Sequence, residues 1–248
     1  MPQPRAAASP GRRPPATPHV LTLGNERTKG IMSWTTTASA VAGIIIPDSR
    51  LAKEAAEILR ADGNDLIWNH SHRVYLFGAL LAERAGKRYD PELSYIAALF
   101  HDLGLVHKYS TQTERFEVDG ANAARQFLEQ HGIAQDAIDV VWDAIALHTT
   151  LGITKFKKAE VDLIFNGVGL DVMGDLYDTL SDATRQEVVG AFPRDGFKSK
   201  IVPAFFEGFK HKPQTTFGNI KADVMERLQP GYKSPNFVDL IAASPWTE

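Results

Sequence analysis

The stretch AALFHDLG, residues 97–104, places a histidine and an aspartate directly after four apolar residues. The sequence before it supplies Asp90 as a suitable N-cap and Pro91 for the first helical position. A glycine follows, so we predict a helix that carries His101 and Asp102 at its last turn. Together they offer an imidazole nitrogen and a carboxylate oxygen to a divalent cation. The alternative is a core histidine beside a solvated turn residue, but an aspartate at a buried helix end needs a partner.

Helical patterns of the same kind continue along the chain, with glycine or proline at their ends. The sequence AGIIIPD near residue 45 is a possible strand, and a single strand makes no sheet. We therefore predict an all-α fold, a compact multi-helix bundle. The expected helices lie within residues 47–63, 69–86, 90–104, 119–132, 134–148, 158–177, 181–192, 197–212 and 219–230.

The first 33 residues are rich in Pro, Ala and Arg and lack the apolar core of a signal peptide. Three interpretations are open: a disordered tail, a transit-like segment, or sequence upstream of a true start at Met32. We favour a disordered tail or an upstream sequence over a transit-like segment, because such a high proline content disfavours the amphipathic helix of a transit peptide. The predicted organisation is a tail over 1–33 and one catalytic domain over 34–248.

The composition narrows the function. The 248 residues include no cysteine and have a net charge of −3. Any metal must therefore be held by His, Asp or Glu, and a nucleic-acid partner is not expected. No apolar run reaches the roughly 18 residues that suggest a membrane span. We expect a cytoplasmic enzyme with a small-molecule substrate; the sequence IVPAFFEGF could either serve a homo-oligomer contact or close the core.

The sequence NHSHRVYLFG contains two histidines, His70 and His72. Residues two apart on a helix point to nearly opposite sides, so both cannot easily bind one ion. The first histidine shares a helix face with Val74, Phe77 and Leu81, so it is predicted to point into the core. We expect His72 on the surface or behind the ligands. A lone inward histidine is ordinarily a core residue, but the His–Asp pair favours a metal site.

Asp171 lies between apolar residues in the sequence NGVGLDVMGDLYD. A buried carboxylate needs a cation or a hydrogen-bond donor, unless it stands at a glycine bend. Asp162 and Asp175 compete with it for such a role. The position of Asp162 four residues after Lys158 suits a pair on the surface.

The order H-S-x-R-V, A-L-x-H-D-L-G and a distant aspartate resembles the HD-domain superfamily of metal-dependent hydrolases. The resemblance implies one ion, taken as Zn²⁺, although Mn, Fe or Ni would also fit. The implied metal ligands are His70, His101, Asp102 and Asp171, with water in the open positions.

From about residue 46 to 209 the chain also resembles the cyanamide hydratase branch, through NHSHRVYLFG, HDLGL and RFEVDGANAARQFL. This resemblance implies hydration of cyanamide, or a similar small nitrile, to urea through metal-activated water. Glu117 occupies the position of a histidine found in two-metal relatives, and His148 is the one further candidate, which favours one ion. His107 and His131 are interpreted as surface residues.

Glu117 and His148 are the candidates for moving protons, with Asp119 as a weaker third. The alternatives are an ion pair of Glu117 with Arg115 or Lys108, and a helix C-terminal role for His148. Arg73 is expected to pair with a carboxylate such as Asp102 or Glu117 and to steady the ligands. The residues expected to bind substrate are Asn69 and Thr149.

Two other functions remain open. An HD phosphohydrolase acting on a nucleotide or another phosphate ester would need cations that converge on the metal, for which Lys155, Lys157 and Lys158 are the best cluster. The second is a non-catalytic HD module that binds a ligand or a partner. The presence of all four ligand types in order argues against this function.

Overall fold

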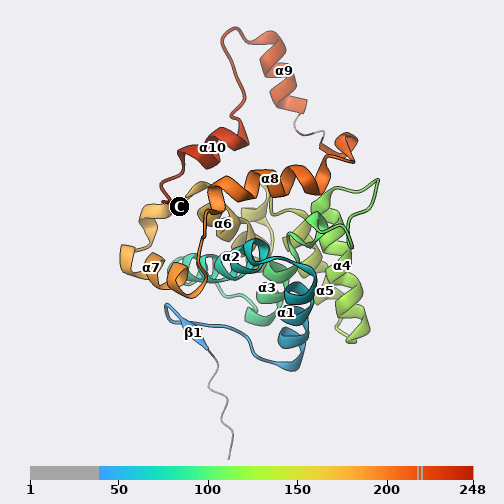
Figure 1. Ribbon diagram of the computed structural model, residues 1–248, viewed down its shortest axis with the longest axis vertical. Coiled ribbons are helices and arrows are strands. Elements are labelled where there is room, and N and C mark those ends of the chain that lie inside the picture. Colours follow the sequence, from blue (N-terminus) through green and yellow to red (C-terminus); the bar gives the residue numbers. More distant parts are fainter. Residues whose placement is uncertain (1–38, 217, 219, 248) are drawn as a thin grey trace, which may run out of the picture. The chain divides into compact units, whose positions relative to one another are not determined.

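The computed structural model describes residues 39–216, 218 and 220–247. The predicted tail over residues 1–33 lies outside the described residues, so the boundary after residue 33 stays a prediction. The elements shown in Figure 1 are β1 (Ala40–Val41), β2 (Ile44–Ile45), α1 (Arg50–Asp62), α2 (Asp65–Arg84), α3 (Pro91–Phe100), η1 (Leu103–Leu105), α4 (Phe116–Gln130), α5 (Gln135–Ala146), η2 (Thr154–Phe156), α6 (Ala159–Met173), η3 (Tyr177–Thr179), α7 (Asp182–Ala191), α8 (Phe197–Phe209), η4 (Pro213–Thr216), α9 (Ile220–Leu228) and α10 (Phe237–Ala243).

The predicted all-α bundle is confirmed, and the predicted N-terminal cap of α3 is present, although the helix ends at Phe100, so His101 and Asp102 follow it and do not form its last turn. The Asp90 side chain accepts hydrogen bonds from the N–H groups of Glu92 and Leu93, and Pro91 opens the helix. Helix α4 starts at Phe116, three residues before the predicted segment. Helix α10 was not predicted; its N-cap is Asn236, which accepts from the N–H of Val238.

The possible strand near residue 45 does find a partner, contrary to the prediction. Strands β1 and β2 pair antiparallel, with Ala40 opposite Ile45 and Val41 opposite Ile44. Ala42 and Gly43 connect them with positive φ angles of 50° and 85°, as a tight two-residue hairpin requires. A two-residue ladder is too short for period-two alternation to reveal it.

Helices α2 and α6 form the centre of the bundle, and α8 lies across one side of it (Figure 1). Helix α2 is buried around most of its circumference, from Ile67 through Ala82. Its backbone meets α6 closely at two glycines: a Cβ on Gly78 would lie 2.4 Å from the oxygen of Leu163, and one on Gly167 would lie 2.1 Å from that of Val74. This approach brings Asp171 of α6 beside His70 of α2.

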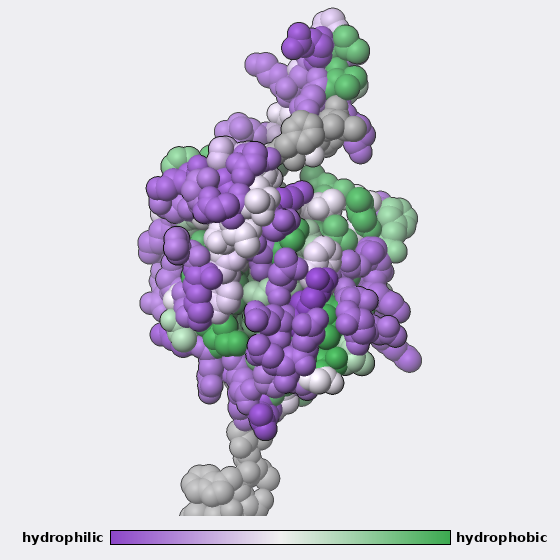
Figure 2. Space-filling model, turned by 90° about the vertical axis from the view of Figure 1, so that its right-hand side faces the viewer, coloured by the Kyte–Doolittle hydropathy of each residue, from purple (hydrophilic) through white to green (hydrophobic). Residues whose placement is uncertain are grey.

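One face of the molecule is mainly polar. Figure 2 shows one face on which hydrophilic side chains predominate and hydrophobic ones form separate clusters. Among the described residues, no helix is both long and apolar enough to cross a membrane.

We expect Gly167→Ala to lower the free energy of unfolding by about 2 kcal/mol or more, because overpacking a close helix contact forces backbone shifts. Urea denaturation measures the change. The matched control is Gly190→Ala in α7, where an added Cβ meets nothing within 4 Å and should stabilise the helix by about 0.5–1 kcal/mol. Equal stability of Gly167→Ala and the wild type would contradict the contact.

Candidate metal centre

Three histidines from separate helices meet around one aspartate. His70 lies in α2, His101 follows the last residue of α3, Asp102 precedes η1, and His148 follows α5. All four side chains are at most 2% exposed. One ligand atom from each of His70, His101 and Asp102 lies within 4.8 Å of the others. The structure thus brings together three of the four predicted ligands.

Hydrogen bonds orient the three imidazoles in the same way. Each Nδ1 donates to an oxygen: that of His70 to Asp171 Oδ2 at 2.7 Å, that of His101 to the carbonyl of Ala98 at 2.7 Å, and that of His148 to the carbonyl of Ile145 at 2.6 Å. The carbonyl partners can only accept, so Nδ1 carries the proton. In the neutral imidazole each Nε2 is left with a lone pair, the form in which histidine binds a metal, and the Nε2 atoms of His70 and His101 lie 3.2 Å apart.

These lone pairs face the Asp102 carboxylate. Oδ2 lies 3.5 Å from His70 Nε2 and 3.3 Å from His101 Nε2, and Oδ1 lies 3.7 Å from His148 Nε2. Within the described part of the chain, neither carboxylate oxygen has a hydrogen-bond partner. A buried carboxylate beside lone pairs is unfavourable unless a proton or a cation lies between them. The donors therefore fit a divalent cation.

The charges around the centre also favour a divalent cation. Burial lowers the pKa of His70 and brings that of His148 to about 4, so both imidazoles are neutral and able to bind a metal. Burial opposes the charges of His101 and Asp102, yet their mutual attraction outweighs it, raising the pKa of His101 and lowering that of Asp102. A positive charge between them is therefore stabilised.

Asp171 lies behind His70 in the structure. Its carboxylate accepts from His70 Nδ1, from Arg73 Nε at 2.8 Å and Nη2 at 2.9 Å, and from Arg194 Nη1 at 2.6 Å. Burial opposes ionisation, but these cations hold the pKa of Asp171 well below its usual range. A carboxylate on the outer nitrogen of a histidine orients it toward a metal. A direct bond from Asp171 to the ion stays a prediction.

The predicted partner of Arg73 was wrong. Arg73 pairs with Asp171, and it also donates to the carbonyls of Phe192 and Pro193. Its position one turn after His70 directs it toward α6, on which α2 packs, and α6 contributes Asp171. The sequence alone does not reveal this pairing, because Asp171 follows Arg73 by 98 residues.

Glu117 lies in the first turn of α4, 4% exposed, beside His148. Its Oε1 accepts from Arg115 Nη2 at 2.6 Å and from the Thr149 hydroxyl at 2.5 Å. Burial raises the pKa of Glu117, but the hydrogen bond from Arg115 acts against it, and the net shift is downward. Glu117 is thus an ionised carboxylate next to the centre, and the predicted ion pair with Arg115 is present as well.

Thr149 is exposed, and its hydroxyl binds Glu117. Asn69 is half-buried and lines a cavity with Arg194 and Lys200. Asp119 accepts from Lys212 Nζ at 2.6 Å and from Thr111, so it is held in a buried ion pair. The functional roles of these residues stay predictions.

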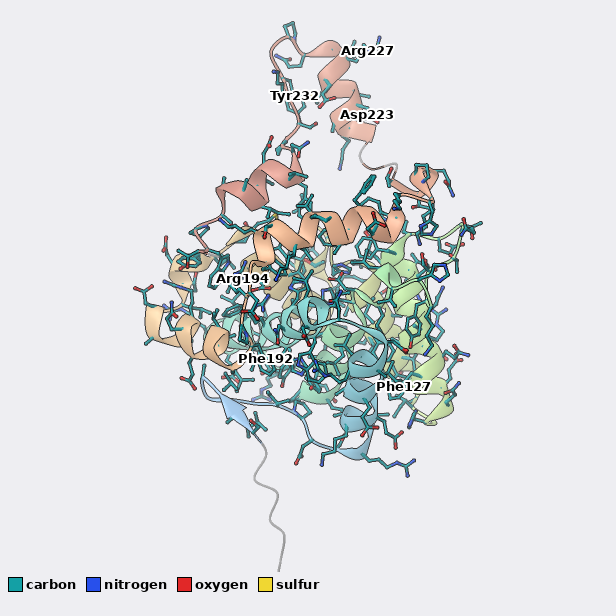
Figure 3. All side chains as sticks on the ribbon, in the orientation of Figure 1. Phe127, Phe192, Arg194, Asp223, Arg227 and Tyr232 are labelled. Atoms are coloured by element: carbon teal, nitrogen blue, oxygen red, sulfur yellow. The ribbon has the colours of Figure 1, made fainter. Side chains whose placement is uncertain are left out.

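His72 is not on the surface. It is 3% exposed, its Nδ1 donates to the carbonyl of Trp68, its Nε2 accepts from the Tyr95 hydroxyl at 3.0 Å, and its ring stacks on Phe192, which Figure 3 labels. The surface alternative is wrong because α2 is surrounded by other elements, so a different helix face is still an interior face. The contacts satisfy both ring nitrogens and explain His72 without a metal.

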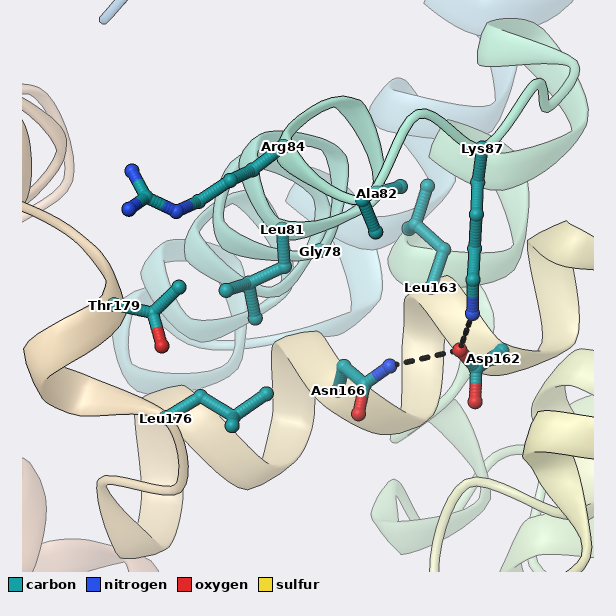
Figure 4. Close-up of a pocket in the computed structure, with 11 residues that line it drawn as sticks. Gly78, Leu81, Ala82, Arg84, Lys87, Asp162, Leu163, Asn166, Leu176 and Thr179 are labelled. Atoms are coloured by element: carbon teal, nitrogen blue, oxygen red, sulfur yellow. Dashed lines mark hydrogen bonds and ion pairs between the residues drawn. The ribbon is translucent and has the colours of Figure 1, made fainter.

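The surface pair predicted for Asp162 was also wrong. Asp162 is 6% exposed and pairs with Lys87 Nζ at 2.5 Å, not with Lys158. Asn166 donates to the same carboxylate at 3.0 Å, and the group lines a pocket with Gly78 and Leu163 (Figure 4). Its first-turn position on α6 turns it toward the end of α2. Of the other two histidines, His107 is exposed, and His131 is half-buried and pairs with Glu54.

Sequence reasoning missed Arg194 and Trp246. Arg194 stands in the loop between α7 and α8, and Trp246 follows α10. Both are at most 6% exposed. No periodic pattern surrounds either of them, so only their tertiary contacts reveal them.

The bundle and its buried His–Asp cluster define a helical domain suited to a divalent cation. Residues 67–185 match the family model of the HD domain. All four predicted ligands lie within this segment, and HD-domain proteins are metal-dependent enzymes, mostly phosphohydrolases. No curated protein matches the chain.

We expect His101→Ala and Asp102→Ala to abolish bound metal, because each removes a donor from the centre. Elemental analysis of the purified protein measures the metal per chain. The control is His72→Gln, which should retain the metal, since His72 is satisfied by Trp68 and Tyr95. If His72→Gln alone lost the metal, the ligand would be His72 and the assignment of His70 would be wrong.

Proposed function

We propose that the protein is a metal-dependent hydro-lyase that hydrates cyanamide, or a similar small nitrile, to urea or the corresponding amide. The observation that carries the proposal is the burial of the centre together with an ionised carboxylate beside it. His70, His101 and Asp102 are at most 1% exposed, and Glu117 stands next to them beside His148. Such a site suits a small, uncharged substrate and a reaction that only adds water.

Aromatic side chains cover the centre. The Phe197 ring of α8 lies 5.0 Å from that of His70, and the Phe116 ring lies 5.5 Å from that of His148. Phe205 and Phe209 of α8 pack on Phe116 at 5.9 and 6.3 Å. An apolar cover of this kind favours a compact substrate and excludes bulk water, which strengthens electrostatic interactions inside.

The cations near the centre support a neutral substrate over a phosphate ester. Phosphoryl transfer relies on cationic groups aimed at the phosphate. Among the described residues, Arg73 and Arg194 bind Asp171, and Lys212 binds Asp119. In the lysine cluster weighed for a phosphohydrolase, Lys157 pairs with Asp143 and Lys155 lies over the ring of Phe156.

A bound divalent cation would supply a Lewis acid that makes water nucleophilic near neutral pH. His70, His101 and Asp102 would hold it; two nitrogens and a carboxylate oxygen suit Zn²⁺, and Mn, Fe or Ni stay open. Glu117 accepts a proton from water as its oxygen adds to the nitrile carbon, and returns it to the nitrile nitrogen. The isourea so formed tautomerises to urea; one water is added and nothing leaves.

His148 and Arg115 set the state of Glu117 in this scheme. The neutral imidazole of His148 adds no fixed charge, because burial holds its pKa near 4. Arg115 and Thr149 donate to Glu117, which keeps the carboxylate ionised and directed. A cytoplasmic location and a homo-oligomer remain predictions for the protein.

We expect metal-loaded protein to form urea from cyanamide and to release no phosphate from a panel of nucleotides. Glu117→Gln should lower kcat by about 10²- to 10⁴-fold, the usual contribution of a general acid–base group, while metal content stays at the wild-type level. The matched control is Glu114→Gln, an exposed residue three positions earlier, which should keep full activity. Release of phosphate without formation of urea would contradict the proposed hydratase and indicate a phosphohydrolase.

A further inference from the structure

The contacts that orient His70 involve residues close to the C-terminal end of the described chain. Arg194 donates through Nη1 to both the side chain of Asp171, at 2.6 Å, and its main-chain carbonyl, at 2.9 Å. It therefore holds the carboxylate and the backbone of the same residue. Figure 3 shows Arg194 reaching in from the loop before α8. The orientation of His70 depends in turn on that carboxylate.

Trp246 encloses this arginine. The Arg194 guanidinium carbon lies 4.7 Å from the centre of the Trp246 ring and 4.7 Å from that of Phe197. A guanidinium beside two aromatic rings gains cation–π attraction and loses alternative rotamers, and the attraction is stronger away from water. Trp246 is itself 6% exposed.

Trp246 also binds the helix that carries Asp171. Its indole Nε1 donates to the carbonyl of Leu170 at 2.6 Å, directly before Asp171 in α6. The preceding Pro245 packs so tightly on the end of α6 that a Cβ on Gly174 would lie 2.3 Å from its Cδ. The segment after α10 thus contacts α6 both before and after Asp171 in the sequence.

From these contacts we infer that Trp246 is a positioning residue of the metal centre: by holding Arg194 and the Leu170 carbonyl it fixes Asp171, which aims His70 Nε2 at the ion. The inference rests on the proposed metal centre and not on the choice of substrate. It assigns the residues after α10 a part in metal binding, although they lie outside the segment that matches the HD domain.

The test compares wild type, Trp246→Ala and Trp246→Phe as purified full-length protein loaded with Co²⁺. Two readouts are used: the affinity, by competition with a chelator, and the visible Co²⁺ absorption spectrum, which reports the ligand geometry. Trp246→Ala should weaken binding about 10-fold, the low end for removal of an outer support, and change the spectrum. Trp246→Phe keeps a ring over Arg194 and loses the indole donor, so its affinity should fall between the two.

Leu59→Ala in α1 is the control for general destabilisation. Leu59 is fully buried, so its loss should lower Tm while the affinity and the spectrum stay those of the wild type. If Trp246→Ala does not fold, Arg194→Lys takes its place, because lysine lacks the planar guanidinium that lies beside the rings of Trp246 and Phe197 and should also weaken binding.

A folded Trp246→Ala, or a folded Arg194→Lys in its place, with wild-type affinity and spectrum would overturn the inference and leave the metal centre standing. A wild-type protein that binds no Co²⁺ would overturn both. Since neither readout uses a substrate, failure to form urea would contradict the proposed function alone.

Discussion

The buried Asp102 carboxylate is the constraint on which the site depends. It is 1% exposed, has no hydrogen-bond partner in the described part of the chain, and faces imidazole nitrogens that carry lone pairs. That arrangement is unfavourable in a protein core, because an unpaired buried charge is far more unfavourable than a hydrogen-bonded one. A positive charge resolves it, and the shared position of the Nε2 atoms suits a metal ion better than a proton.

The helices are arranged to aim these donors. His101 and His148 are each held by a carbonyl three residues earlier, so the end of α3 and the end of α5 orient their own ligands. His70 lies within a helix, where carbonyls are already bonded, and it relies on Asp171 of a neighbouring helix. The close glycine contacts between α2 and α6 make that support possible.

The surroundings of the centre bear on the chemistry as much as the ligands do. Arg73 and Arg194 neutralise Asp171, so their charge is used in orienting a ligand. Aromatic residues of α8 and the start of α4 form the cover, and Glu117 enters from the same turn of α4. The result is a buried centre with an ionised carboxylate, Glu117, beside it.

The helical bundle, the N-terminal cap of α3 and the inward direction of His70, His101 and Asp102 can be predicted from the sequence alone. Helical periodicity, N-capping residues and the His–Asp pair are local signals, so they survive without coordinates. Three features depend on how the helices pack: the burial of His72, the pairing of Arg73 with Asp171, and the support of that pair by Arg194 and Trp246. A helix covered on all sides has no outward face, and partners separated by 98 residues or more meet only when helices pack.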